Sequence, residues 1–400
     1  MAGRNDMKTA QRVFPSYPHF GNLANKSEKE YNAGRHKIKK TKIMKKFWTI
    51  ALLAIFFSGL SLSRADAKTL SLPKQITQNK FGFLYGGGEE GKLVKKYHAG
   101  WARPHTGPFV WGDIQETAEV SFDFSRTDAL VSDLSRKKIG ILATLWPFAE
   151  WDQMMRDDAQ TCKVSDTDQF LLSGKEGSVG LPQYRCNPYD WSAYRNWVQN
   201  LVERYDGDGV DDMPGLRYPV KYWEAMNEPD LEGSATLDFF VGNAADYGDL
   251  LTTTYSAVKE ADPTANVLIA GAANVDDRSL NFYRAVFGSP AARNSFDIAN
   301  VHCISSGDVP SLNVGPYKEM LSEFGLDAKP LWVTEAEVMV SGNKKENARQ
   351  LTASTKEARR LGASRIFFTR FSLNAAKDYG DWDLYSRKIY RNIFKKKWAL

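Results

Sequence analysis

Two glutamates near the ends of apolar, strand-like runs are candidates for acid–base chemistry. Glu228 lies in the motif MNEPD at 226–230, and Glu335 lies in the motif WVTEAE at 332–337. Two facing carboxyl groups supply the proton donor and the carboxylate that cleavage of a glycosidic bond needs. A separation of about 5–5.5 Å permits direct attack with retention of configuration, whereas a wider gap admits water and gives inversion. The two glutamates act on one bond only if the fold brings the motifs together.

Eight strand-like runs follow residue 80, and amphipathic stretches separate them. Several runs are continuously apolar, which is typical of strands covered on both faces. The amphipathic stretches have the spacing of helices, and Ser125 to Asp128 has the form of a capping box. The Gly- and Lys-rich connection 86–96 is the weakest helical candidate. The predicted strands are 81–85, 97–103, 139–145, 220–226, 266–271, 297–302, 330–335 and 364–370, and further predicted helices are 190–205, 238–260, 279–287, 314–324 and 344–361.

This alternation predicts an α/β fold with parallel strands. Eight units of this kind favour a closed barrel over an open doubly wound sheet. We therefore predict a single catalytic domain at 80–390 with the architecture of a (β/α)8 TIM barrel. In such barrels the chemistry lies at the C-terminal ends of the strands. The fourth and seventh strands face each other across that rim, so Glu228 and Glu335 can converge.

The combination of Asn-Glu-Pro after the fourth run and Trp-Val-Thr-Glu in the seventh resembles the clan A retaining glycoside hydrolases. The amino-acid sequence around the motifs is similar to that of families 39 and 5. The resemblance extends over most of 80–372 and includes the segment 257–271. It implies that the site consists of Glu228 as general acid/base, Glu335 as nucleophile, Asn227 as partner of the sugar 2-hydroxyl, Arg103 as the group that steadies the nucleophile, and His302 as a substrate-side histidine.

Several alternatives to these roles stay open. Asn-Glu-Pro is also a turn motif, and Glu337 could serve in place of Glu335 because the sequence does not fix the end of the strand. Glu224, inside the fourth run, is more consistent with an interior partner of a basic residue. Ile304 stands where the related families commonly have tyrosine, and Phe371 stands where many have tryptophan. These departures keep open a second hypothesis, a carbohydrate-binding barrel without turnover.

Tryptophans near the predicted rim loops are candidate platforms for sugar rings. We predict that Trp146 and Trp151 contact substrate in this way, with packing inside the loops as the alternative. The predicted mechanism uses no metal and no cofactor. The Gly-rich stretch 86–88 lacks the spacing of a dinucleotide-binding motif.

An acidic stretch at 206–212, DGDGVDD, precedes the fourth run. Its aspartates Asp206, Asp208 and Asp211 have some likeness to a calcium loop, but the ligand spacing and closing glutamate of an EF-hand are absent. A solvated turn is the favoured interpretation, and calcium binding is the alternative.

The N-terminal region has the layout of an export signal. Residues 47–62 are 16 uncharged residues, preceded by Lys45 and Lys46 and followed by a small-residue site at 65–67. The apolar run is shorter than the roughly 20 residues that a spanning helix needs. We predict a signal peptide at 44–67 and a disordered or upstream extension at 1–43, with an uncleaved anchor as the alternative. The expected mature protein is periplasmic or secreted, without a membrane span.

The positive net charge of +5 belongs to this leader. Residues 1–67 contain 13 of the 53 Lys and Arg residues and 4 of the 48 Asp and Glu residues, so 68–400 carry a net charge of −4. This balance argues against nucleic-acid binding. The resemblance to the clan A glycoside hydrolases implies instead that the partner is a β-linked oligosaccharide or polysaccharide, cleaved by double displacement.

Export permits disulfides, and three cysteines follow the leader. Cys162 and Cys186 flank a polar stretch without helical or strand periodicity, so we predict a bridge between them. Cys303 lies beside an apolar run and is expected to be buried and free.

Overall fold

The computed structural model describes residues 69–164, 180–231, 238–307, 309–377 and 381–395. All of them belong to one structural unit, Ser63–Leu400. The predicted extension at 1–43 and signal peptide at 44–67 lie outside the described residues.

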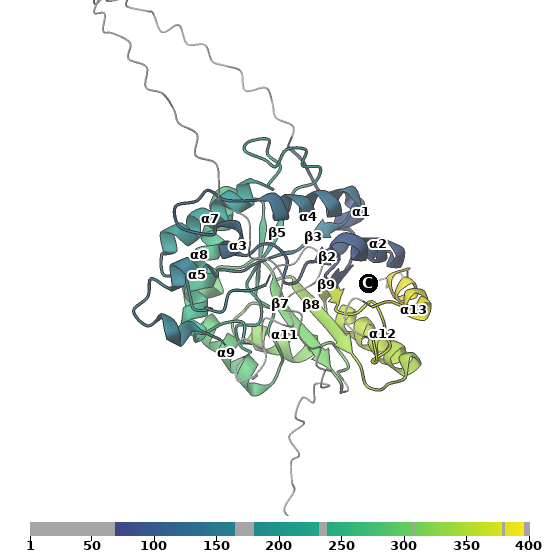
Figure 1. Ribbon diagram of the computed structural model, residues 1–400. Helices are drawn as coiled ribbons and strands as arrows, with labels where there is room; N and C mark the ends of the chain where they lie inside the picture. The colour runs from purple at the N-terminus through teal and green to yellow at the C-terminus, as the bar shows by residue number, and fades with distance from the viewer. Residues whose placement is uncertain (1–68, 165–179, 232–237, 308, 378–380, 396–400) are drawn as a thin grey trace, which may run out of the picture. The chain divides into compact units, whose positions relative to one another are not determined.

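The described strands form two parallel sheets, and Figure 1 shows them at the centre of the unit with helices around them. The larger sheet has the order β3-β2-β1-β9-β8-β7, and the smaller has the order β4-β5-β6. The predicted α/β class with parallel strands is therefore confirmed. The strands are β1 (Phe81–Leu84), β2 (Trp101–Arg103), β3 (Gly140–Ile141), β4 (Ala143–Leu145), β5 (Tyr222–Ala225), β6 (Asn266–Ile269), β7 (Ala299–Ser305), β8 (Leu331–Val338) and β9 (Ala363–Phe368).

Backbone contacts join the two sheets at both edges. Leu142 alone separates β3 from β4, and its N–H donates to the carbonyl of Ala102 at 3.0 Å. At the other edge, isolated parallel bridges pair Leu268 with Ile298 and Ala272 with Val301, between β6 and β7.

Every predicted run overlaps a described strand, but the boundaries differ. The run 97–103 is shorter as a strand, because Tyr97 ends a helix and β2 begins at Trp101. The seventh run is longer, since β8 continues to Val338 and is buried along its whole length. Full burial on both faces explains why the apolar runs do not alternate.

Helices follow most of the strands. A helix forms even in the segment 86–96, which is the weakest helical candidate in the sequence. There α2 has Glu89 and Glu90 in its first turn and Lys95 and Lys96 in its last, as the helix dipole favours. The helices are α1 (Lys74–Thr77), α2 (Gly88–Tyr97), α3 (Trp111–Ile114), α4 (Ser125–Arg136), α5 (Glu150–Gln153), α7 (Trp191–Glu203), α8 (Ala244–Ala261), α9 (Asp277–Gly288), α10 (Pro290–Arg293), α11 (Val314–Ser322), α12 (Lys344–Arg360), α13 (Leu384–Lys395) and the 3-10 helix Ala159–Cys162.

The predicted capping box at the start of α4 is wrong. Ser125 is already inside the helix, and the residue before it, Phe124, makes no side-chain cap. The N–H of Ser125 is satisfied instead by the carboxylate of Asp123 at 2.8 Å. An aspartate two residues upstream thus performs the capping that the motif assigned to the serine.

The N-terminal ends of the strands are closed by an aromatic cage around a cation. The guanidinium of Arg365 lies 4.0 Å from the ring centre of Trp101 and 4.4 Å from that of Trp332. Arg365 also donates to the carbonyl of Thr77 in α1, and Trp101 donates to that of Ile76. This packed end leaves the C-terminal ends of the strands as the place for polar side chains.

The predicted disulfide is confirmed. Cys162 and Cys186 are bonded, with their Cα atoms 5.1 Å apart and a sequence separation of 24. The N–H of Arg185 donates to the carbonyl of Cys162 at 2.9 Å, so backbone pairing accompanies the bridge. Cys303 is free and buried, and burial raises the pKa of its thiol to about 12.

Loss of this bridge is expected to destabilise the fold. The double substitution Cys162→Ala and Cys186→Ala should lower the free energy of unfolding by about 3 kcal/mol, because the unfolded chain regains the entropy of an open loop. Urea unfolding measures the change, with Cys303→Ala as the control that keeps the bridge. Mass spectrometry of unreduced peptides should find Cys162 joined to Cys186, and recovery of Cys303 in a disulfide would contradict the assignment.

Candidate active site

A fully buried arginine connects side chains from three strands. Arg103, the last residue of β2, has no exposed side-chain surface. Its Nε donates to Glu224 at 2.7 Å, its Nη1 to Glu335 at 2.8 Å, and its Nη2 to Asn227 at 2.6 Å. Each nitrogen of the buried guanidinium therefore has an acceptor, which matters because an unpaired buried charge is very costly. Burial lowers the pKa of Arg103, but the two carboxylates outweigh this effect and the net shift is upward.

Glu224 is an interior structural carboxylate, as its position in the fourth run indicated. Besides Arg103, it accepts hydrogen bonds from Thr144 at 2.6 Å, Asn300 at 2.6 Å and Thr334 at 3.1 Å. These contacts engage both carboxylate oxygens of Glu224, which makes it a structural partner of the surrounding side chains.

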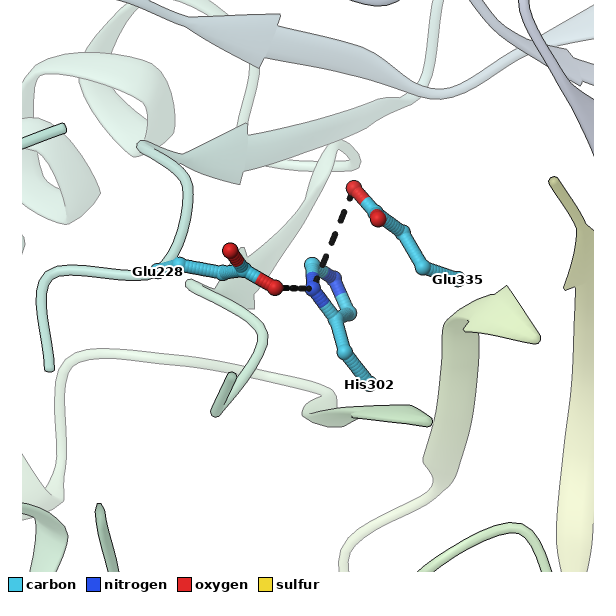
Figure 2. A group of neighbouring side chains, drawn as sticks. All are labelled: Glu228, His302 and Glu335. Atoms are coloured by element: carbon cyan, nitrogen blue, oxygen red, sulfur yellow. Dashed lines mark hydrogen bonds and ion pairs between the residues drawn. The ribbon is translucent and has the colours of Figure 1, made fainter. Parts of the chain in front are cut away.

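Glu228 and Glu335 lie close to each other with His302 between them (Figure 2). Nδ1 of His302 is 2.7 Å from Oε1 of Glu228 and 3.8 Å from Oε1 of Glu335. These three ligand-type atoms all lie within 4.8 Å of one another. The fold therefore brings the two sequence motifs into one site.

Glu228 comes from the loop after β5, where the backbone is strained. Met226 and Glu228 have φ angles of 74° and 40°, in the left-handed region that residues with a side chain rarely adopt. Such strain concentrates at functional sites, where the surrounding structure holds it in place.

An irregularity in β8 aims Glu335 into the site. Val301 of β7 pairs with Val333 of β8, but the next residue, His302, pairs with Glu335, so β8 has one extra residue at Thr334. A bulge of this kind re-aims the side chains around it. Thr334 and Glu335 are adjacent in sequence, yet both reach interior partners.

Glu337, the alternative to Glu335, has different partners. Its Oε1 lies 2.9 Å from Nε of Arg370, and its Oε2 accepts a hydrogen bond from Thr369 at 2.7 Å. Both partners follow β9, so the contacts of Glu337 lie outside the group formed by Glu228, His302 and Glu335.

The two polar atoms of the Asn227 side-chain amide differ in their hydrogen bonding. Its Oδ1 accepts from Arg103, which places its Nδ2 on the opposite side. That Nδ2 is buried, and among the described residues it has no acceptor. A buried donor without a partner is uncommon in proteins, and this one is available to a bound molecule.

Burial and charge act in opposite directions on the site's titrating groups. Burial raises the pKa of Glu335, and although His302 and Arg103 act to lower it, the net shift is upward. Burial lowers the pKa of His302, an effect that the carboxylate of Glu335 opposes and Arg103 reinforces. His302 is therefore favoured as the neutral imidazole.

The same three side chains have the donor types of a transition-metal site, with one nitrogen and two carboxylate oxygens. However, the Oε1 of Glu335 that faces His302 is also the atom that accepts from Arg103 at 2.8 Å. A guanidinium so close to the shared ligand atom repels a second cation. The arrangement suits proton chemistry better than metal binding.

The two tryptophans predicted to contact substrate have different environments. Trp146 is completely buried and donates to the carbonyl of Thr106 at 2.9 Å, so it has no open face for a sugar ring, and the packing alternative fits it. Trp151 is half-buried and donates to the carbonyl of Gln115 at 2.8 Å. It lines a surface hollow with Val110, Gly112, Asp113, Glu116, Glu150, Gly180, Leu181 and Pro182.

The two departures from the family pattern lie in different places. Phe371 is fully buried and stacks on Phe83, with ring centres 4.5 Å apart, so it belongs to the core. Ile304 lies on β7 opposite Glu337. Its side chain makes no hydrogen bond to Glu335, whose steadying contact comes from Arg103.

The acidic stretch before β5 forms a turn that uses its own carboxylates. Asp212 accepts from the N–H groups of Gly207 and Gly209 at 2.9 and 2.8 Å, and Asp206 accepts from that of Asp208 at 3.0 Å. The aspartate that joins Asp206 and Asp208 is Asp212, where the sequence suggested Asp211. These bonds are those of the turn interpretation.

Sequence reasoning missed four polar residues around the site: Asp230, His105, Asn300 and Thr334. Asp230 is buried and accepts from the N–H of Ala273 at 3.1 Å. Its place in the 226–230 motif was a usable signal. Asn300 and Thr334 stand within apolar runs, where a polar residue marks the interior of the sheet.

Comparison with known proteins gives matches in structure only. No protein-family model matches this chain, and no curated protein sequence matches it. A glucosidase from Croceicoccus marinus aligns with a TM-score of 0.55 and 14% identity, over 82% of this chain and 69% of that one. Xylanase 10B from Thermotoga maritima aligns with a TM-score of 0.50 and 13% identity, over 82% and 99%.

A family 39 glycoside hydrolase from the gut symbiont Bacteroides cellulosilyticus WH2 aligns with a TM-score of 0.50 and 14% identity, over 79% of this chain. The chain has the fold of these glycoside hydrolases. It covers 63% of the family 39 protein, which is less than two thirds of its length. The expected resemblance to family 39 therefore holds at the level of the fold.

Asp230 is expected to make stability depend on pH. Burial, reinforced by the charge of Glu228, raises the pKa of Asp230 from its ordinary 3.8 to about 7. Between these values the folded state binds more protons than the unfolded state, so the contribution of Asp230 to stability falls as pH rises. Relative to wild type, Asp230→Asn should gain up to about 4 kcal/mol between pH 4 and pH 8.

Urea unfolding at several pH values measures this difference. Asp190→Asn is the control of opposite sign, because hydrogen bonds from Ser192 and Ala193 lower the pKa of the Asp190 carboxyl. A difference between Asp230→Asn and wild type that stays constant from pH 4 to pH 8 would show that Asp230 does not titrate in this range.

Proposed function

We propose that this chain is an exported retaining glycoside hydrolase that cleaves a β-linked oligosaccharide or polysaccharide by double displacement. The observation that carries the proposal is the pairing of Glu228 and Glu335 in unlike environments. One carboxyl group lies against a guanidinium, and the other lies against a neutral imidazole. This difference is what a nucleophile and a general acid require of their surroundings.

The proposed steps follow from these surroundings. Glu335, with its charge compensated by Arg103, attacks the anomeric carbon, and Glu228 gives its proton to the leaving oxygen. Glu228 then takes a proton from the water that releases the sugar. The nearness of the two carboxyl groups supports direct attack, since one oxygen of each lies within 4.8 Å of the other. The free Nδ2 of Asn227 is placed to donate to the sugar 2-hydroxyl.

We further propose that the strands close into one (β/α)8 barrel, with β3 and β4 as parts of a single strand. The short gap at Leu142 and the bridges between β6 and β7 support a continuous ring. In such a ring, β2, β5, β7 and β8 end on one rim. This rim carries all the residues assigned to the reaction.

Export rests on the predicted signal peptide at 44–67 and on the disulfide. A bridge such as that between Cys162 and Cys186 persists in oxidising compartments, which fits a periplasmic or secreted protein. Within the described residues, none of the helices combines the length and apolar character needed to cross a bilayer.

A place for further sugar units is the hollow beside Trp151. The comparison proteins are named as a glucosidase and xylanases, and enzymes on such polymers use aromatic side chains to hold successive rings. In this proposal Trp151 supports a ring beyond the cleavage point, and Trp146 supports the wall behind it.

The nucleophile is tested by substitution at Glu335. Glu335→Gln should fold normally and lose turnover of aryl β-glycosides, because an amide does not attack the anomeric carbon. Glu335→Gly with added azide should regain some activity and yield the glycosyl azide of inverted configuration, since azide occupies the space of the missing carboxylate. Product configuration by proton NMR is the measurement.

The matched control is Glu337→Gln, a buried glutamate on the same strand. It should keep turnover within about 10-fold of wild type, the range expected of a residue outside the reacting atoms. The reverse result, with Glu335→Gln active and Glu337→Gln inactive, would transfer the nucleophile to Glu337. Retention on polysaccharide without turnover in wild type would favour the carbohydrate-binding alternative.

The acid/base role is tested by leaving-group dependence. Glu228→Ala should lose about 10²- to 10⁴-fold in rate on substrates with poor leaving groups, and far less on activated phenols, which depart without protonation. With activated substrates a burst of phenol should precede a slow steady state. Azide should accelerate that second phase and give a glycosyl azide of retained configuration. Equal losses on all leaving groups would remove Glu228 from this role.

A further inference from the structure

The position of the ring hydrogen on His302 determines whether Glu228 accepts or donates the hydrogen bond between them. The ring is fully buried, with Nδ1 2.7 Å from Oε1 of Glu228 and Nε2 2.8 Å from Oγ1 of Thr334. A neutral imidazole donates from one nitrogen and accepts at the other. The tautomer therefore determines whether Glu228 accepts a hydrogen bond as a carboxylate or donates one as a carboxylic acid.

The starting point of the hydrogen-bond chain is Glu224, which accepts from the guanidinium of Arg103. Nδ2 of Asn300 donates to Glu224 at 2.6 Å, and the reverse orientation of the amide would place two acceptor oxygens against each other. Oδ1 of Asn300 is consequently fixed toward Thr334, whose Oγ1 lies 2.9 Å away. Only Thr334 can supply the hydrogen in that contact.

Thr334 has a single hydroxyl hydrogen, and two acceptor oxygens lie within hydrogen-bond distance of its Oγ1. These are Oδ1 of Asn300 at 2.9 Å and Oε1 of Glu224 at 3.1 Å. Whichever receives the hydrogen, the oxygen of Thr334 has only lone pairs left for Nε2 of His302. That nitrogen must then carry the ring hydrogen and donate it to Thr334.

We propose that Thr334 is a positioning residue that fixes His302 with its hydrogen on Nε2, so that Nδ1 accepts the hydrogen of a protonated Glu228. The catalytic meaning of this arrangement rests on the proposed function, in which Glu228 is the general acid. The chain runs from Glu224 through Asn300, Thr334 and His302 to Glu228. Through this chain, the interior carboxylate of Glu224 favours the protonated form of the carboxyl group of Glu228.

The surroundings hold the ring in place for this purpose. A Cβ atom at Gly271 would lie 2.1 Å from Nε2 of His302, so the ring fills the space beside that glycine. Asn313 fixes the backbone, because its Nδ2 donates to the carbonyl of His302 at 2.7 Å. The charged and titratable groups whose fields act on the ring come from several elements, and they are Glu228, Glu335, Glu224, Asp230, Arg103 and His105.

The direct test is the protonation of the ring nitrogens. The full chain, labelled with ¹⁵N at its five histidines, is measured by long-range ¹H–¹⁵N correlation, and His302→Asn identifies the signals of His302. We expect hydrogen on Nε2 and a bare Nδ1 at neutral pH. Hydrogen on Nδ1 alone, or on both nitrogens, would overturn the proposal, and this result does not depend on activity.

A matched pair of variants tests the part played by Thr334. Thr334→Val keeps the shape but removes the hydroxyl, so the hydrogen should move to Nδ1 and Glu228 should become the acceptor. Thr334→Ser should restore the wild-type spectrum. Thr144→Val is the control, because Thr144 also donates to Glu224 but is not part of the chain to His302. An unchanged tautomer in a folded Thr334→Val would overturn the role of Thr334.

Kinetics give an independent readout of the same change. In Thr334→Val the basic limb of the pH profile of kcat/KM, which reports the general acid, should move about one pH unit lower. Above that limb, turnover of substrates with poor leaving groups should fall about 10-fold, with activated phenols nearly unaffected. Equal losses on both substrate types would overturn the positioning role. Absence of turnover in wild type would defeat the proposed function and leave the spectroscopic test intact.

Discussion

The buried guanidinium of Arg103 is the interaction on which the site depends. Glu224 and Asn227 from the end of β5 and Glu335 from β8 converge on its nitrogens. Taking one such charge out of water costs several kcal/mol unless the partners are complete and well placed. The arginine therefore orders the ends of β2, β5 and β8 relative to one another, and a lysine, with a single compact ammonium, would not reproduce its planar fork.

From this centre the two catalytic candidates acquire different characters. The carboxylate of Glu335 pairs with the guanidinium of Arg103, whereas the carboxyl group of Glu228 lies against the ring of His302. The difference does not come from the glutamates themselves, which are chemically identical. It comes from where each lies in the fold and from which groups face it there, so the proposed division of roles is a property of the fold.

The sequence predicted the strand regions, which depend on local residue patterns, and the disulfide, which depends on the spacing of two cysteines. Apolar runs located all eight strand regions, and cysteine spacing located the disulfide, because both reflect what each segment can bury or close. Trp146 was predicted at the rim but is buried, since its exposure depends on the packing of other loops. The interior polar chain through Asn300 and Thr334 could not be predicted, because side-chain hydrogen bonds across strands depend on register, and the register of β8 changes at Thr334.

That change of register has a consequence for protein design. In a regular strand, successive side chains point to opposite faces, so only one of Thr334 and Glu335 could point inward. The extra residue in β8 gives both of them interior partners. A designer who transplants this site onto an idealised barrel must therefore copy the irregular backbone together with the side chains, because straight strands would have to discard either the carboxylate or the hydroxyl.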